Sequence, residues 1–200
     1  MTAPPSRLPP RLPPSNYLAG YAAELQAQVQ DQLAEGTLGK RLQRRYAEPH
    51  GVRTDGMLYD YTMALKNRHL RNAEPLSKVV FDNRLHVIRN ALGTHTTVSR
   101  VQGSRLKAKR EIRIAGLFRT LPAEFLKMIV VHELAHMKER DHDKAFYALC
   151  LHMEPGYHQL EFDLRLCLMH AEATGQALWP GAGAVPVVPA PNDPAITSPP

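Results

Sequence analysis

The segment His132-Glu133-Leu134-Ala135-His136 places two imidazoles four positions apart, with a carboxylate directly after the first. Residues four apart on a helix project from the same face, so both imidazoles can hold one metal ion. Zinc suits such nitrogen ligands, at roughly 2.0–2.1 Å from each ring nitrogen. Glu133 would lie beside the ion and accept the proton of a zinc-bound water, whose pKa the ion lowers to about 7. The segment therefore predicts a hydrolytic zinc site with Glu133 as the general base.

His142 is the candidate for the third protein ligand that a catalytic zinc takes while keeping a fourth position open. If the helix continued, six residues at 100° each would carry His142 about 120° away from His136. We therefore expect the helix to end near Arg140 and the chain to turn at Asp141, because Asp tolerates the left-handed region better than most residues. Asp143 should then cap the next helix. The alternative is that His142 is an ordinary surface residue.

Three further side chains, those of His158, Tyr147 and Tyr157, could reach an oxyanion in the transition state. Ordinary packing or surface exposure is the competing interpretation for each of them. A purely structural zinc would need four protein ligands, and the sequence offers no evident fourth one nearby. The pattern therefore favours a catalytic site.

The elements that position these residues follow from hydrophobic periodicity. Residues 17–34 and 57–71 are typical of helices, and the short apolar runs 78–81 and 85–88 predict a hairpin. Residues 106–114 alternate between apolar and charged side chains, which indicates a strand with one buried face. Helical spacing returns from residue 121, and further helices are expected at 144–153 and 157–173. The order of the elements predicts an α+β fold.

Proline marks both ends of the chain: six of its 17 prolines lie in residues 1–14 and seven lie in 180–200. Such segments bury too little apolar surface to offset the entropy lost on ordering. We therefore expect a disordered Pro-rich tail at 1–16, an N-terminal helical segment at 17–75, a domain carrying the histidines at 76–174, and a second disordered Pro-rich tail at 175–200.

The formal net charge is +6, and the basic residues are concentrated in two groups that could bind a negatively charged partner. Basic groups of this kind can meet nucleic acid or form solvated surface. One group is Lys40, Arg41, Arg44 and Arg45; the other is Arg105, Lys107, Lys109, Arg110 and Arg113.

The two cysteines, Cys150 and Cys167, match neither a disulfide framework nor a CxxC metal motif, so we expect small buried hydrophobes. No apolar run reaches the roughly 18 residues that cross a bilayer, and no apolar segment follows the N-terminal arginines. We expect a cytoplasmic protein without a membrane partner.

The histidine segment resembles the YgjP-like family of zinc metallopeptidases, part of the zincin group. The resembling residues are Val130-Val131-His-Glu-Leu-Ala-His136, then His142, Asp143 and Phe146, with strand 109–114 and Pro122 upstream. The similarity covers about residues 77–170. It implies a zincin-like α+β fold, with a small sheet packed on an active-site helix and additional N- and C-terminal helices. It also implies that the three histidines are the ligands and Glu133 the general base.

The sequence departs from related patterns in two places, and the first of them bears on substrate contacts. Residues 101–104 stand where the family often has Trp-Gly-Ser-Cys, and Glu139 stands where metzincins have Gly.

A metallopeptidase acting on a peptide or protein substrate is the first functional hypothesis, with strand 106–114 as an edge to which an extended peptide adds. YbeY-like endoribonucleases share the three-histidine spacing but carry Gly in place of Glu133, which argues against that alternative. A third hypothesis is a protease recruited to nucleic acid, as in zincins of the SprT and WLM types, whose DNA affinity would fall steeply with salt.

Overall fold

A computed structural model describes residues 17–46, 49–85, 93–102 and 105–179 of the chain. Its elements, in chain order, begin with three helices and a strand: α1 (Ala23–Ala34), α2 (Thr37–Arg45), α3 (Asp55–His69) and β1 (Leu76–Asp82). Two strands and a 3₁₀ turn follow: β2 (Gly93–Gln102), β3 (Arg105–Ala115) and η1 (Gly116–Arg119). The described chain ends with α4 (Ala123–Ala135), α5 (Lys144–Met153) and α6 (Tyr157–Thr174). The predicted α+β class is confirmed.

The three strands form one sheet in the order β1-β3-β2, in which β1 is parallel and β2 antiparallel to β3. Strand β3 is therefore central. From Arg110 to Ile114 it is paired on both sides, with β1 and with β2. The prediction that strand 106–114 offers a free edge is wrong over this part, because a strand with two partners has no unused hydrogen-bonding side.

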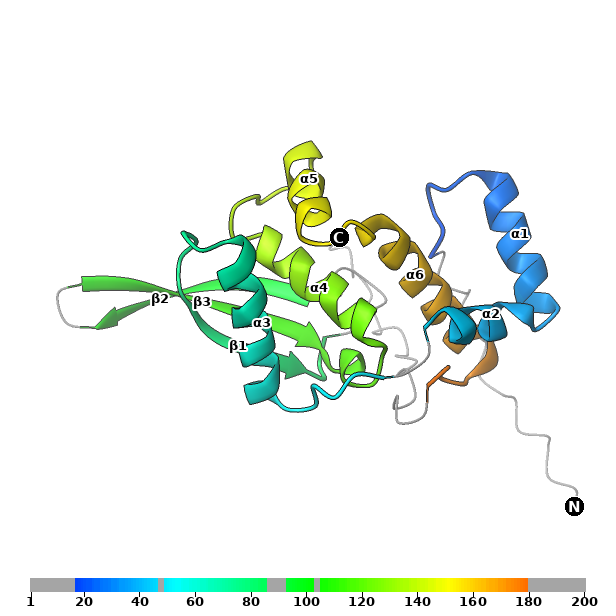
Figure 1. The fold of residues 1–200 in the computed structure, drawn as a ribbon, viewed down its shortest axis with the longest axis horizontal. Coiled ribbons are helices and arrows are strands. Elements are labelled where there is room, and N and C mark those ends of the chain that lie inside the picture. Colours follow the sequence, from blue (N-terminus) through cyan, green and yellow to red (C-terminus); the bar gives the residue numbers. More distant parts are fainter. Residues whose placement is uncertain (1–16, 47–48, 86–92, 103–104, 180–200) are drawn as a thin grey trace, which may run out of the picture.

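One face of the sheet is covered by helices. The side chains of Val79, Phe81, Ile112 and Ile114 are buried, and their alternation along β1 and β3 puts them on one face. Helix α3 packs against β1, and α4 packs against β2 and β3 (Figure 1). Helix α6 contacts α4, and α2 contacts α6 at the end of the molecule away from the β2–β3 hairpin (Figure 1). Helix α4 thus lies between the sheet and the C-terminal helices.

The N-terminal helices differ from the sequence-based expectation. Residues 17–34 contain only α1, which begins at Ala23, and a second helix, α2, starts directly after Gly36. Gly36 has a φ of +68°, a left-handed conformation that glycine adopts at little cost. The chain therefore turns between two short helices, and the apolar side chains of Leu38 and Leu42 are buried in the second.

The sequence predicts a hairpin in which 78–81 pairs with 85–88. In the structure, residues 78–81 belong to β1, and the partner of β1 is a different strand. Strand β1 pairs in parallel with β3, although Leu85 N–H donates to the Asp82 carbonyl in a turn, 3.3 Å. Residues 86–88 lie outside the described residues. The antiparallel partner of β3 is β2, a strand that the apolar pattern did not predict.

Leu178 and Trp179 lie inside the segment predicted as a C-terminal tail from residue 175, yet both are buried. The indole N–H of Trp179 donates to the carbonyl oxygen of Tyr46, 3.0 Å away. Leu178 and Trp179 therefore pack against the folded part. The rest of that predicted tail, and the tail at 1–16, fall outside the described residues.

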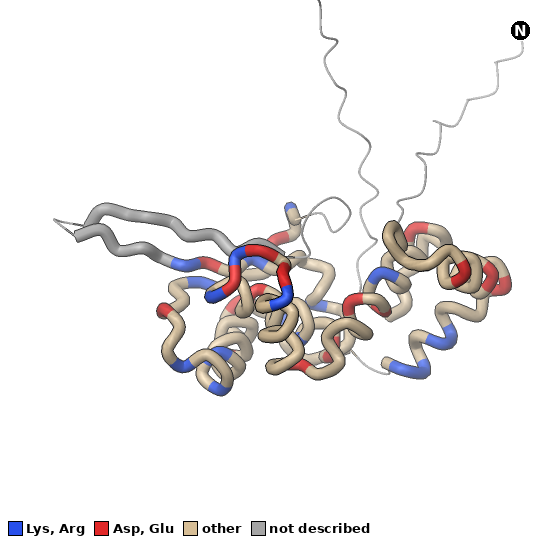
Figure 2. Tube along the Cα trace, turned by 90° about the horizontal axis from the view of Figure 1, so that it is seen from above, with Lys and Arg blue, Asp and Glu red and all other residues tan. Residues whose placement is uncertain are grey.

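Basic and acidic residues are interspersed over the described tube (Figure 2). Several of the basic residues singled out above form ion pairs within the chain: Arg45 with Asp163, Arg110 with Glu74, and Arg113 with Asp82. These pairs reduce the charge that a nucleic acid could meet, whereas side chains of residues 105–109 lie outside the described part. Nucleic-acid binding stays a prediction.

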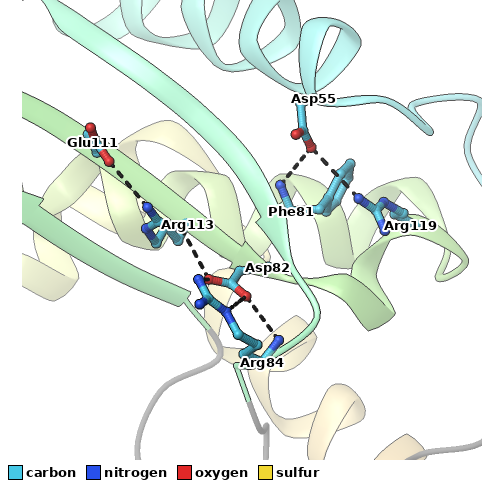
Figure 3. Close-up of polar contacts among 7 residues, drawn as sticks. All are labelled: Asp55, Phe81, Asp82, Arg84, Glu111, Arg113 and Arg119. Carbon is cyan, nitrogen blue, oxygen red and sulfur yellow. Dashed lines mark hydrogen bonds and ion pairs between the residues drawn. The ribbon is translucent and has the colours of Figure 1, made fainter.

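A polar cluster fixes the end of β1 against β3 (Figure 3). The carboxylate of Asp82 accepts hydrogen bonds from Arg84 and from Arg113, at 3.1 Å each. Hydrogen bonds from Arg84, the charge of Arg84 and a hydrogen bond from Arg113 hold the pKa of Asp82 well below its ordinary range. The cluster therefore ties a loop after β1 to the central strand.

Asp55, at the start of α3, also connects separate elements through its carboxylate (Figure 3). Its carboxylate accepts the backbone N–H of Phe81, 3.0 Å away, and is paired with Arg119 of η1 at 3.7 Å. The guanidinium of Arg119 in turn lies 4.8 Å from the centre of the Phe81 ring. Helix α3, strand β1 and η1 are thus joined where the chain enters α4.

Both cysteines are free and buried, as predicted. Within the described ranges, no helix has both the length and the apolar character that crossing a bilayer requires.

Candidate metal centre

Helix α4 is apolar on almost all sides because it lies between the sheet and α6. Nine of its thirteen residues are buried, and Glu133 is the one charged residue among these nine. The helix ends at Ala135, with His136 as its C-cap in a right-handed conformation. The predicted end near Arg140 is therefore four to five residues too late, because the chain turns directly after His136.

The return of the chain to His142 uses successive tight turns. Backbone hydrogen bonds from Met137 to Leu134 and from Lys138 to Ala135 close the end of α4. In the described chain only glycines have positive φ, so the left-handed Asp141 that we expected is absent. Asp143 caps α5 as predicted, since its carboxylate accepts the N–H groups of Ala145 at 2.9 Å and Phe146 at 3.0 Å.

The turns bring the three histidines together. One ring nitrogen from each of His132, His136 and His142 lies within 4.8 Å of the others, and Nε2 of His132 is 3.2 Å from Nε2 of His142. Two nitrogen ligands on a tetrahedral ion at about 2.0–2.1 Å would stand roughly 3.3 Å apart. A hydrogen bond between the two Nε2 atoms would also give a separation of 3.2 Å. The nitrogen of a third imidazole lies beside this pair, however, and three converging nitrogens favour one bound cation. The donor set fits a metal ion.

Hydrogen bonds at the other ring nitrogens set the orientation of two of these rings. Nδ1 of His136 lies 3.0 Å from the Glu139 carbonyl oxygen, which can only accept, so Nδ1 carries the proton and Nε2 of the neutral ring keeps its lone pair. Nδ1 of His132 lies 2.6 Å from the Tyr157 hydroxyl, which can accept from it in the same way. Such partners are typical of metal-ligating histidines.

Phe146 forms the floor of the cluster. Its ring is fully buried, and its centroid lies 5.0 Å from that of His132, 4.6 Å from that of His136 and 4.6 Å from that of His142. One side chain, held by the capped first turn of α5, therefore supports all three imidazoles. Its position follows from the Asp143 cap.

Two of the histidines, His132 and His136, are held in the neutral form that binds metals. Burial lowers the pKa of His132 to about 3, with smaller contributions from the charges that His136 and His142 would carry. Burial also lowers the pKa of His136. Protonated rings at these positions would repel each other, so the cluster favours unprotonated nitrogens.

Glu133 is buried, with 1% of its surface exposed, and its Oε2 has no hydrogen-bond partner among the described residues. Burial raises the pKa of its carboxyl group to about 8. A buried carboxyl without a cation is costly, and a cation at the adjacent histidines would offset that cost. The unpartnered oxygen is therefore a second observation that fits a metal ion.

The three candidates for oxyanion stabilisation separate in the structure. Tyr157 is buried, and its hydroxyl is engaged with His132, so it orients a histidine instead of facing a substrate. Tyr147 is half-buried and His158 is exposed, with ring centroids 5.2 Å apart. Sequence spacing could not separate these roles, because Tyr157 reaches His132 across 25 residues.

The family model described as YgjP-like, metallopeptidase domain, matches residues 76–166, which include the three histidines and Glu133. A protein of Escherichia coli (strain K12) named UTP pyrophosphatase is 62% identical over 134 residues, covering 67% of this chain and 80% of that protein. No solved structure matches the chain. The residues matched by the family model and the extent of this identity show that the chain belongs to the YgjP-like family.

Proposed function

We propose that this chain is a metal-dependent hydrolase that cleaves a nucleoside triphosphate into the monophosphate and pyrophosphate, with UTP as the substrate to test first. The observation that carries the proposal is the convergence of three histidines beside a buried carboxylate. That cluster occurs in a chain 62% identical to a protein named UTP pyrophosphatase. The family description points to metal-dependent hydrolysis, and the relative's name points to a phosphoanhydride substrate.

His132, His136 and His142 would hold the ion, and we propose zinc because three imidazole nitrogens suit it. When bound, the ion supplies positive charge that lowers the pKa of water at the site and stabilises negative charge on the phosphoryl oxygens. Tyr157 and the Glu139 carbonyl keep two of the rings turned toward the ion. Phe146 keeps water away from the buried side of the cluster.

Glu133 would act on the attacking water. It takes a proton as the water oxygen forms a bond to the α-phosphorus of the triphosphate. The bond from that phosphorus to the oxygen bridging to the β-phosphorus breaks, and pyrophosphate leaves with the electron pair. The proton then passes from Glu133 to solvent, so one water is consumed for each monophosphate and pyrophosphate formed.

The test begins with metal-free protein reloaded separately with Zn²⁺, Mn²⁺ or Mg²⁺ and incubated with UTP. Chromatography measures UMP, and a coupled assay measures pyrophosphate. We expect equal amounts of both products, and a loss of roughly 10²- to 10⁴-fold in rate for Glu133→Gln. Glu124→Gln is the matched control, because Glu124 is an exposed residue of the same helix. Orthophosphate as the only phosphate product, or full activity of Glu133→Gln, would contradict the proposal.

Peptide hydrolysis is a second candidate, favoured by the family description as a metallopeptidase domain and by the His-Glu-x-x-His pattern itself. The same residues would serve, with Glu133 taking the proton of a water that attacks the scissile carbonyl. The same metal-loaded protein should be incubated with an unfolded protein. Cleavage that is lost in Glu133→Gln, together with intact UTP, would favour this candidate over the first.

A further inference from the structure

A pair of aromatic rings lies directly beside the histidine cluster. The ring centroid of Tyr147, on α5, is 6.5 Å from that of His142. His158 is the second residue of α6, and its ring centroid lies 5.2 Å from that of Tyr147. Tyr147 is half-buried and His158 is exposed, so both present surface to the solvent. The two rings form an accessible aromatic strip that begins at a histidine of the metal centre.

The strip is supported from below. Tyr147 packs on Phe146 at 5.3 Å and on Tyr157 at 6.3 Å, and His158 packs on Tyr157 at 5.7 Å. Phe146 and Tyr157 are both buried, and both contact the histidine cluster. The position of the strip is therefore fixed relative to the metal centre by the same two rings that support the histidines.

Exposed aromatic rings beside a phosphate-binding centre suit one kind of chemical group. A nucleobase is flat and apolar on its faces, and it stacks on aromatic side chains whatever its edge pattern. In a nucleotide a single ribose separates the base from the α-phosphate. A triphosphate held at the histidines would thus bring its base over a neighbouring side chain and not into the core.

We propose that Tyr147 and His158 form a stacking subsite for the pyrimidine base of the nucleoside triphosphate. The subsite rests on the proposed function, because it takes the phosphate chain to lie at the three histidines. It explains why two aromatic side chains stay accessible next to the centre, while Tyr157 and Phe146 are buried under it. It also predicts that base-containing and base-free ligands respond differently to changes in the strip.

The test compares two inhibitors of the metal-loaded protein, UMP and pyrophosphate, of which only UMP has a base. Tyr147→Leu removes the aromatic ring but keeps an apolar side chain, and His158→Ala alters an exposed position that the fold does not require. Base stacking on aromatic rings is worth about 1–3 kcal/mol by substitution, so the inhibition constant of UMP should rise about 5- to 150-fold in Tyr147→Leu. The inhibition constant of pyrophosphate and the bound metal should stay as in the wild type.

Tyr59→Leu is the matched control, because Tyr59 is a half-buried tyrosine of α3 whose hydroxyl donates to the Leu76 carbonyl oxygen of β1, outside the strip. Equal inhibition by UMP in wild type and in both strip variants, with UTP hydrolysis intact, would overturn the subsite and leave the proposed function standing. An equal rise for UMP and pyrophosphate would also overturn it, since the substitution would then act on the metal centre. A wild type that neither hydrolyses UTP nor binds UMP would remove the proposed function and the subsite together.

Discussion

Tyr157→Phe isolates the hydrogen bond that orients one proposed metal ligand. The substitution keeps the buried ring and removes only the hydroxyl, which lies 2.6 Å from Nδ1 of His132. Loss of such a partner typically weakens metal binding 10- to 100-fold, which corresponds to about 1.4–2.7 kcal/mol. A hydrogen bond of this kind contributes about 1 kcal/mol to folding, so the metal-free variant should remain folded.

The assay is a competition between the protein and a chelator for Zn²⁺, with the absorption spectrum of the Co²⁺-substituted protein as a report on ligand geometry. Tyr46→Phe is the matched control. Tyr46 is also buried, and its hydroxyl donates to Asp163 at the same distance of 2.6 Å, but this bond lies apart from the histidines. Tyr46→Phe should lose at least as much stability as Tyr157→Phe, because its hydroxyl donates to a buried carboxylate, and only Tyr157→Phe should lose metal affinity. Unchanged affinity and an unchanged Co²⁺ spectrum in Tyr157→Phe would refute this reasoning.

Three other predictions concern the frame around the centre. Phe146→Ala removes a fully buried ring that contacts all three histidines. In urea denaturation, the free energy of unfolding should fall by about 3–5 kcal/mol. A fall of less than about 1 kcal/mol would contradict the packing described. The folded-state pKa of Asp82 lies well below the unfolded value of about 3.9, so its carboxylate stabilises the fold fully above that pH, and the stabilisation is lost as pH falls through the folded-state pKa. Asp82→Asn should therefore destabilise at pH 7, and its effect should shrink steadily as pH falls below about 4; an equal effect at pH 7 and pH 2 would be inconsistent with the arginine contacts. A chain ending at Ala177 lacks the buried Leu178 and Trp179 and should melt at a lower temperature than a chain ending at Trp179; equal melting temperatures would exclude a structural role for these two residues.

Local signals predicted the elements that carry the histidines. Helix α5 has the predicted bounds because Asp143 caps it and Pro155-Gly156 follows it. Strand β3 was indicated by alternation, and its apolar residues Ile112 and Ile114 are buried as expected. The sequence also predicted that the three histidines would lie close together. That prediction came from one requirement: the helix that carries His132 and His136 has to end before His142 for His142 to reach them.

Contacts between distant segments could not be read from local patterns. The parallel pairing of β1 with β3 joins segments that are separated by β2 in the sequence, and the periodicity of neither strand specifies its neighbour. Strand β2 was missed because its residues, rich in Thr, lack a clear apolar alternation. The sequence predicts the end of α4 too late because no proline or glycine marks it, and because the guanidinium of Arg110 on β3, which donates to the Met137 carbonyl just past the helix, is far away in the sequence.

The partners of the site residues were hidden for the same reason. Tyr157 follows His132 by 25 residues, and no spacing rule connects a tyrosine at a helix start with a histidine in another helix. The support that Phe146 gives to all three histidines became visible only once α5 was placed against α4.

The most direct test of the central claim measures metal content and UTP cleavage on the same samples of wild type, His142→Ala and Glu133→Gln. We predict one bound metal ion and equal release of UMP and pyrophosphate for the wild type, loss of both for His142→Ala, and retained metal without cleavage for Glu133→Gln. Full metal content in His142→Ala, or UTP cleavage by Glu133→Gln at the wild-type rate, would contradict the account.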